Sequence, residues 1–197
     1  MEFCDSLIRE KMNIYWEGSS RVDVVDKEML SKMHQAGYWR IAFGIESGSQ
    51  KVLDLIDKNI TKEKVMNAVK WAKEVGMKVT GFFMIGNYGE DESTMVETIN
   101  FAKSLPLDYV QFTVAVPYPG TRLYSIIEKE GKFLFDNWSE LGSYSGKAYF
   151  EHDKVKKELV EKMFKKAYRS CYLNPRMIFK KILEFRWDML RFWSLLR

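Results

Sequence analysis

The sequence predicts an α/β fold built from parallel β/α units. Between residues 14 and 116, short runs rich in β-branched and aromatic residues recur, and each run is followed by a segment of helical periodicity. Gly37 and Gly76 follow two of these segments, where a helix end favours a left-handed residue. This alternation is typical of a parallel sheet whose strands are connected by helices.

The elements follow one another in a regular order. We expect strands over residues 14–17, 39–45, 77–85 and 109–116. We expect helices over residues 2–12, 26–37, 49–57, 61–76 and 90–104. Asp26 and Thr61 act as N-cap residues, because a side-chain oxygen can accept from the free N–H groups of a first helical turn. Lys58 and Asn59 break the helical pattern before Thr61.

The strand count leaves two architectures open. Four parallel strands cannot close a barrel of six or eight, so the chain forms either an open sheet or part of a larger ring. The helix over 2–12 favours the ring, because a β/α domain that opens on a helix usually lacks the strand before it; a domain that simply begins with a helix is the alternative. The free edge of the first strand would be covered by this helix or by a second copy of the chain.

The β/α rhythm ends after Thr121. A short helix and a glycine-containing loop come next, followed by a Lys-rich amphipathic helix over 153–173 and a last helix that begins at Pro175. We therefore expect a partial β/α barrel over residues 1–130 and a C-terminal helical extension over residues 131–197.

Ligands of parallel β/α domains bind beyond the carboxyl ends of the strands, so the residues after each strand form the candidate site. Arg21 offers a planar fork for a carboxylate or phosphate. Glu46 and Ser47 can bond an amine, a carboxylate or sugar hydroxyls. Gly86 would let a helix start approach an anion or an adenine edge, and Ile85 could flank a base.

Each of these residues also has a structural interpretation. Arg21 can pair with Asp23 or Asp26, Ser47 or Ser49 can cap a helix, Glu46 can be an acid at a helix start, and Gly86 and Gly89 can form a turn. Four rim segments that each combine Gly or Pro with polar side chains favour a binding site over these separate explanations.

Four motifs carry a resemblance to a known family. They are Arg-Val-Asp at 21–23, Phe-Gly-Ile-Glu-Ser-Gly-Ser-Gln at 43–50, Gly-Phe-Phe-Met-Ile-Gly at 81–86 followed by Gly89-Glu90, and Pro-Tyr-Pro-Gly-Thr at 117–121. In this order they resemble radical S-adenosylmethionine (radical SAM) proteins, in particular the branch that often carries a cobalamin-binding domain. The resemblance spans about residues 2–121.

The resemblance implies a partial triose-phosphate-isomerase-type barrel of six β/α units, with a [4Fe-4S] cluster bound after the first strand. That cluster would reduce S-adenosylmethionine and release a 5′-deoxyadenosyl radical. By the same resemblance, Glu46 and Ser47 contact the ribose and methionine parts of the ligand, and Arg21 makes a polar contact to ligand or substrate. The remaining residues implied near the adenine are Ile85, Gly86, Val116 and Pro117, with Glu90 as the later acid of the third motif.

One departure from the family bears on mechanism. The CxxxCxxC motif is absent, and the only cysteines are the widely separated Cys4 and Cys171. Thiolates hold such clusters, so we expect no cluster, no metal site and no catalytic residue here, and an inactive chain by itself. It is then the C-terminal portion of a longer enzyme that uses S-adenosylmethionine, a [4Fe-4S] cluster and cobalamin in some cases, or a stand-alone descendant that lost the chemistry. The retained rim favours the first explanation.

Positive charge is concentrated near the C-terminus. Residues 154–197 hold 13 Lys and Arg against 4 Asp and Glu, whereas residues 1–153 hold 18 against 23. The basic, aromatic segment 175–197 could contact a membrane surface or a protein, and nucleic acid is a weaker choice because no RNA-binding motif is present. The alternative function is therefore a non-catalytic nucleotide-binding or interaction module. Without a signal peptide or a long apolar run, we expect a cytoplasmic protein, at most peripheral at the inner membrane face.

Overall fold

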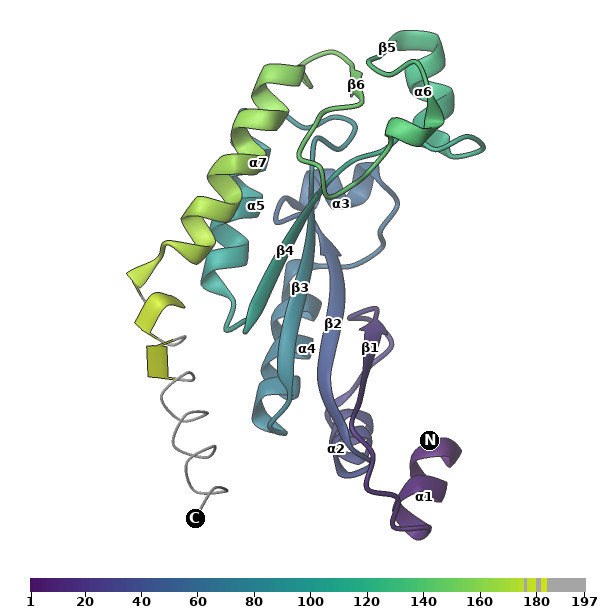
Figure 1. Ribbon diagram of the computed structural model, residues 1–197, viewed down its shortest axis with the longest axis vertical. Helices are drawn as coiled ribbons and strands as arrows, with labels where there is room; N and C mark the ends of the chain where they lie inside the picture. Colours follow the sequence, from purple (N-terminus) through teal and green to yellow (C-terminus); the bar gives the residue numbers. More distant parts are fainter. Residues whose placement is uncertain (176, 180–181, 184–197) are drawn as a thin grey trace.

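The computed structural model describes residues 1–175, 177–179 and 182–183 of the chain (Figure 1). Its centre is a parallel sheet in the order β1-β2-β3-β4. The strands are β1 (Trp16–Ser20), β2 (Tyr38–Glu46), β3 (Lys78–Ile85) and β4 (Tyr109–Val114). Each strand pairs with the next one along the chain, and the predicted α/β class with four parallel strands is confirmed.

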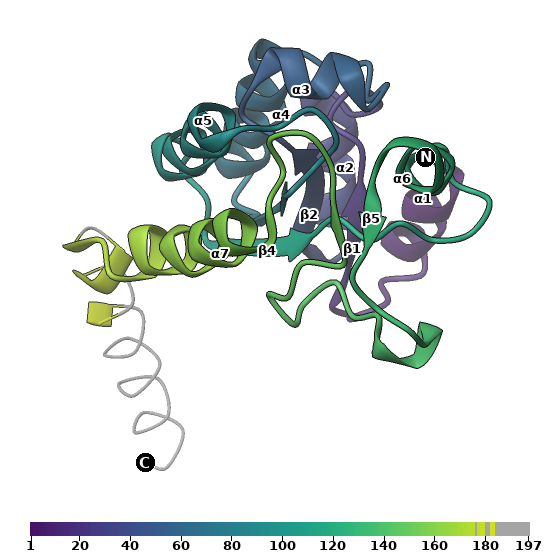
Figure 2. The ribbon, with the colours of Figure 1, turned by 90° about the horizontal axis from the view of Figure 1, so that it is seen from above.

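Helices connect the strands, and further helices follow β4 in the C-terminal part. They are α1 (Glu2–Arg9), α2 (Lys27–Gln35), α3 (Gln50–Leu55), α4 (Lys62–Glu74), α5 (Glu92–Ser104), α6 (Arg122–Glu130), α7 (Lys157–Tyr172) and the short 3-10 helix η1 (Trp138–Glu140). α2, α4 and α5 cover one face of the sheet (Figure 2). No helix in the described part of the chain is long and apolar enough to cross a bilayer.

The core lies between the sheet and these helices. Along β3, Val79, Phe83 and Ile85 are fully buried, whereas the alternating Phe82 and Met84 on the opposite face are only half-buried. This period of two follows from the pleat of a strand. Each buried side chain of this size contributes about 2–3 kcal/mol to folding, so the helix-covered face supplies most of the stability of the sheet.

The predicted N-caps are confirmed. The Asp26 side chain accepts from the backbone N–H of Met29 at 2.7 Å, and the Thr61 hydroxyl accepts from the N–H of Lys64 at 3.2 Å. α5 begins slightly later than expected, because Asp91 is its N-cap and forms a capping box with Thr94.

The outer edge of β4 is closed by the C-terminal part of the chain. The Tyr172 hydroxyl donates to the carbonyl of Val110 at 2.7 Å and accepts from its N–H at 3.2 Å. The Tyr168 hydroxyl bonds both backbone groups of Phe112 in the same way, at 3.1 and 3.2 Å. The outward backbone groups of these two residues, which would otherwise invite pairing with another chain, are therefore satisfied within the molecule.

The β1 edge differs from the β4 edge. The side chains of Glu17 and Ser19 are exposed, although parallel strands are usually covered on both faces. α1 packs through Cys4 and Leu7 against Ala36 at the end of α2. We expected this helix or a second copy of the chain to cover the strand edge. α1 contacts β1 at its first residue, where the ring centroids of Phe3 and Trp16 lie 5.5 Å apart, whereas residues 17–19 of the strand stay exposed.

The C-terminal extension contains more structure than the sequence predicted. A small antiparallel sheet of β5 (Lys132–Phe133) and β6 (Phe150–Glu151) lies in the predicted loop. α7 starts at Lys157, later than predicted, because His152 and Val155 pair with each other first. The basic segment 175–197 lies largely outside the described residues.

Candidate functional site

The predicted site residues follow the carboxyl ends of the strands, which all lie on one rim of the parallel sheet. β1 ends at Ser20 directly before Arg21, β2 ends at Glu46, β3 ends at Ile85, and Val116 follows the end of β4. The structure therefore brings all four predicted segments to the same edge of the sheet, where ligands of parallel β/α proteins bind.

Glu46 occupies a strained position at the end of β2. Its φ is 67°, in the left-handed region that residues other than glycine rarely adopt. Across it, the N–H of Ser47 donates to the carbonyl of Ile45 at 2.9 Å. This i to i+2 bond around a positive φ is typical of the rare, strained form of the γ-turn. Strain of this kind costs about 1–3 kcal/mol and is concentrated at binding sites.

The Glu46 carboxylate is paired with an ammonium group that the sequence analysis did not identify. Lys58 Nζ donates to Glu46 Oε1 at 2.9 Å, and the two side chains are 18% and 21% exposed. Lys58 lies between Asp57 and Asn59, which both have a positive φ. The available signal was the position of this lysine, in the short loop that follows the first helix after the β2 end.

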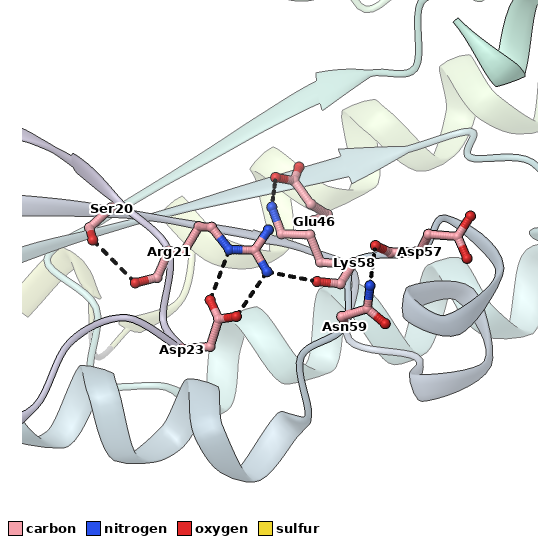
Figure 3. A network of polar contacts seen from close by, with 7 residues as sticks. All are labelled: Ser20, Arg21, Asp23, Glu46, Asp57, Lys58 and Asn59. Carbon is pink, nitrogen blue, oxygen red and sulfur yellow. Dashed lines mark hydrogen bonds and ion pairs between the residues drawn. The ribbon is translucent and has the colours of Figure 1, made fainter.

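Arg21 is held by an acid two residues away. Its Nε and Nη2 atoms donate to the two carboxylate oxygens of Asp23, each at 2.9 Å, which lowers the pKa of that acid. Nη2 also donates to the carbonyl of Lys58 at 3.1 Å. Figure 3 shows these contacts linking the end of β1 to the loop that carries Lys58 and from there to Glu46. Arg21 therefore forms the ion pair with Asp23 that its structural interpretation predicts, and this pair lies at the rim of the sheet.

Ser47 is fully buried and faces α5. Its hydroxyl lies 3.0 Å from Thr98 Oγ1 and accepts from the N–H of Ser49 at 3.1 Å. Ser49 is the N-cap of α3, but its side chain makes no cap bond. The Ser47 side chain therefore fastens the β2 end to the helix layer.

The loop after β3 is organised by Glu90. This side chain is almost completely buried, and its Oε2 atom accepts from the N–H groups of Gly86 and Asn87 at 2.7 and 2.8 Å. Its Oε1 atom has no hydrogen-bond partner among the described residues. Burial raises the pKa of this carboxyl to about 8, against the opposing effect of the two backbone donors.

The apolar residues predicted near a base are inside the protein. Ile85 is fully buried on the helix-covered face, and Val116 and Pro117 are buried after β4. Gly86, at a φ of 82°, faces Val160 of α7. These buried residues do not reach the surface of the rim. The surface of any cavity there must therefore be formed by side chains on the opposite face of the sheet and in the loops.

A cavity of about 320 Å³ opens at this rim between the end of α3, the end of β3 and α6. Its walls combine apolar side chains with an amide, two hydroxyl-bearing residues and an ion pair between Arg122 and Asp57. The residues that line it are Leu55, Ile56, Asp57, Met84, Asn87, Tyr88, Thr121, Arg122, Leu123 and Ile126. Asp57 precedes Lys58, so the cavity and the Glu46 pair are neighbours. The available sequence signal for this wall was alternation along the predicted strand, which places Met84 on the face opposite to Ile85.

The described cysteines do not form a cluster site. Cys4 is buried between α1 and α2, whereas Cys171 is buried in the core through α7. Burial raises the pKa of the Cys171 thiol to about 11. A [4Fe-4S] cluster needs several converging thiolates, and these two residues do not fit that requirement.

The family is decided by comparison with known proteins. The model of the radical SAM superfamily matches residues 2–102, which is half of the chain and includes the ends of β1, β2 and β3. The chain belongs to the radical SAM superfamily. The predicted resemblance is thereby confirmed.

Among relatives of this radical SAM chain, an uncharacterized methyltransferase of Pyrococcus horikoshii is 38% identical over 176 residues. The match covers 89% of this chain but only 38% of that relative. Two solved structures share the fold at 16% identity. Methylornithine synthase matches with a TM-score of 0.61 over 87% of this chain and 42% of that chain. The methyltransferase TsrM from Kitasatospora setae, with cobalamin and a [4Fe-4S] cluster bound, matches with a TM-score of 0.57 over 65% and 27%.

Proposed function

We propose that this chain supplies part of the S-adenosylmethionine site of a radical SAM enzyme whose [4Fe-4S] cluster is held by cysteines outside these 197 residues. The complete enzyme would reductively cleave S-adenosylmethionine for radical chemistry or cobalamin-dependent methyl transfer. The methyltransferases among the relatives and structural neighbours support this class of reaction. Because the cysteines of this chain do not fit a cluster, we assign it ligand binding and no chemical step.

The observation that carries the proposal is the pair of Glu46 and Lys58. A carboxylate and an ammonium group lie 2.9 Å apart at the strained end of β2, and both are largely shielded from water. The methionine end of S-adenosylmethionine carries an ammonium and a carboxylate group. Glu46 can accept from the first and Lys58 can donate to the second, so the ligand would exchange one internal ion pair for two charge-assisted contacts.

The neighbouring cavity fits the other end of the ligand. Met84, Leu55 and Ile126 give it apolar walls, while Asn87 and Thr121 offer hydrogen-bonding groups. A purine has apolar faces and a polar edge, so this lining suits an adenine better than a charged or fully apolar group. The sequence-derived contacts of Ile85, Val116 and Pro117 would then act from behind this surface.

The test is an NMR titration of the 197-residue chain with S-adenosylmethionine. We expect weak binding, with a Kd of about 1 mM (about −4 kcal/mol), because no iron anchors the amino acid end. Amide shifts should concentrate around Glu46, Lys58 and Asn87. Glu46→Gln keeps the shape but removes the charge, and we expect it to weaken binding about tenfold.

The control is Glu10→Gln, which removes an exposed carboxylate at the C-cap of α1, the helix that Figure 1 shows at the other end of the sheet from α3. It should bind like the wild type. Equal affinities of the wild type and Glu46→Gln, or shifts that avoid the rim, would overturn the proposal.

A further inference from the structure

We propose that Thr98 is a positioning residue that holds the Glu46 carboxylate in its ligand-binding orientation, an inference that rests on the S-adenosylmethionine site proposed above. Thr98 is fully buried in the middle of α5, far from Glu46 in the sequence. It does not line the rim cavity. Any effect on the ligand must therefore pass through the residues that it contacts.

The hydroxyl of Thr98 uses its full bonding capacity at the end of β2. Its proton is donated to the carbonyl of Thr94 at 3.0 Å. It accepts from the N–H of Gly48 at 3.0 Å, and the Ser47 hydroxyl, also at 3.0 Å, must then be a donor to it. These two partners are the two residues that directly follow Glu46. The buried Thr98 oxygen is thus hydrogen-bonded to both residues that immediately follow the strained turn.

The close approach of α5 depends on the absence of a side chain at Gly48. A Cβ atom there would lie 2.8 Å from the Cα atom of Thr98 and 2.6 Å from the Cβ atom of Phe101. Glycine lets the chain after β2 lie directly on the helix, where the hydroxyl can reach its N–H. Gly48 and Thr98 therefore act as a matched pair, one giving access and the other making the bonds.

The strained turn needs such an anchor because Glu46 would otherwise relax. A residue other than glycine at a φ of 67° lies above its energy minimum, and rotation to an ordinary φ would turn its side chain away from Lys58. The bonds from Ser47 and Gly48 to Thr98 resist this rotation, because it would leave buried polar groups unpaired. Loss of the Thr98 hydroxyl should therefore reduce ligand affinity while the sheet and helices remain intact.

The experiment compares Thr98→Val, which has the same shape without the hydroxyl, with Thr98→Ser, which keeps it. We expect Thr98→Val to weaken S-adenosylmethionine binding by about fivefold in the NMR titration. It should also speed hydrogen exchange at the Gly48 amide, which donates to the Thr98 hydroxyl. Thr98→Ser should restore both. Val69→Ala in the buried face of α4 is the control for general destabilisation, with unchanged affinity.

The outcomes separate this inference from the proposed function. If Glu46→Gln weakens binding but Thr98→Val does not, the inference is wrong and the site stands. If neither change affects binding, or the wild type does not bind, both are wrong. A failure of Thr98→Ser to rescue, or an equal loss in Val69→Ala, also overturns the positioning role. Should Thr98→Val not fold, Ser47→Ala removes one of the same bonds, and wild-type affinity in that variant would refute the inference.

Discussion

The buried carboxyl of Glu90 should make the stability of this chain depend on pH. Its pKa rises from an ordinary 4.5 to about 8, chiefly because the side chain is only 1% exposed. In the unfolded chain the same group is ionised above about pH 5. Between these two values the folded state therefore holds a proton that the unfolded state has released.

The sign and size of the effect follow from proton linkage. Where the folded state binds more protons, the free energy of unfolding falls as the pH rises. The contribution of Glu90 is thus fully present below about pH 4.5 and is lost as the pH approaches 8. At about 1.4 kcal/mol per pKa unit, the whole loss is about 5 kcal/mol.

The assay is urea denaturation followed by circular dichroism at pH 5, 6, 7 and 8 for the wild type and Glu90→Gln. The variant keeps an oxygen acceptor for Gly86 and Asn87 but cannot ionise. Its stability relative to the wild type should rise by about 1 kcal/mol per pH unit. Glu92→Gln, which removes an exposed carboxylate from the same end of α5, controls for the loss of charge. A difference between wild type and Glu90→Gln that is equal at pH 5 and pH 8 would refute this reasoning.

Two further predictions concern packing and the sheet edge. Tyr172→Phe should lower the free energy of unfolding by about 1–2 kcal/mol and speed amide exchange at Val110; exchange like that of the exposed control Tyr144→Phe would contradict this. Gly48→Ala should cost about 1–3 kcal/mol, because the new Cβ would lie within 2.6–2.8 Å of three atoms of α5. Gly142→Ala, whose Cβ meets only an ordinary contact at 3.7 Å, is its control, and equal urea midpoints for the two would show that the clash is relieved.

Local patterns were sufficient to predict most of the sheet. Runs of β-branched and aromatic residues located β2 and β3, and Asp26 and Thr61 marked the starts of α2 and α4. Both kinds of signal act within a few residues of the chain. β1 was placed too early. Gly18 and Ser19 have little strand preference of their own and are extended because they pair with β2, which is a contact that no local pattern records.

The candidate site was predictable in position but not in detail. Parallel strands end on one edge, so the rim segments could be identified before their contacts were known. The partners of the side chains in these segments could not be predicted in the same way. Ser47 is turned inward by Thr98, and Glu46 is paired with Lys58, through contacts 51 and 12 residues apart in the sequence. Such pairings arise from how helices are laid on the sheet, which the motifs alone do not specify.

The tyrosines that close the β4 edge show how far a helix can take the place of a neighbouring strand. Four helical residues advance about 6.0 Å, whereas two strand residues advance about 6.6 Å. Two hydroxyls that are four residues apart on a helix can therefore reach alternate residues of a strand. The difference between the two distances grows with every further pair. The next position on α7 is Phe164, which has no hydroxyl, and Val114 donates instead to the carbonyl of Ser143 at 2.8 Å. A helix can thus satisfy the backbone groups of a short strand edge. Along a longer edge, a loop must supply the remaining hydrogen bonds.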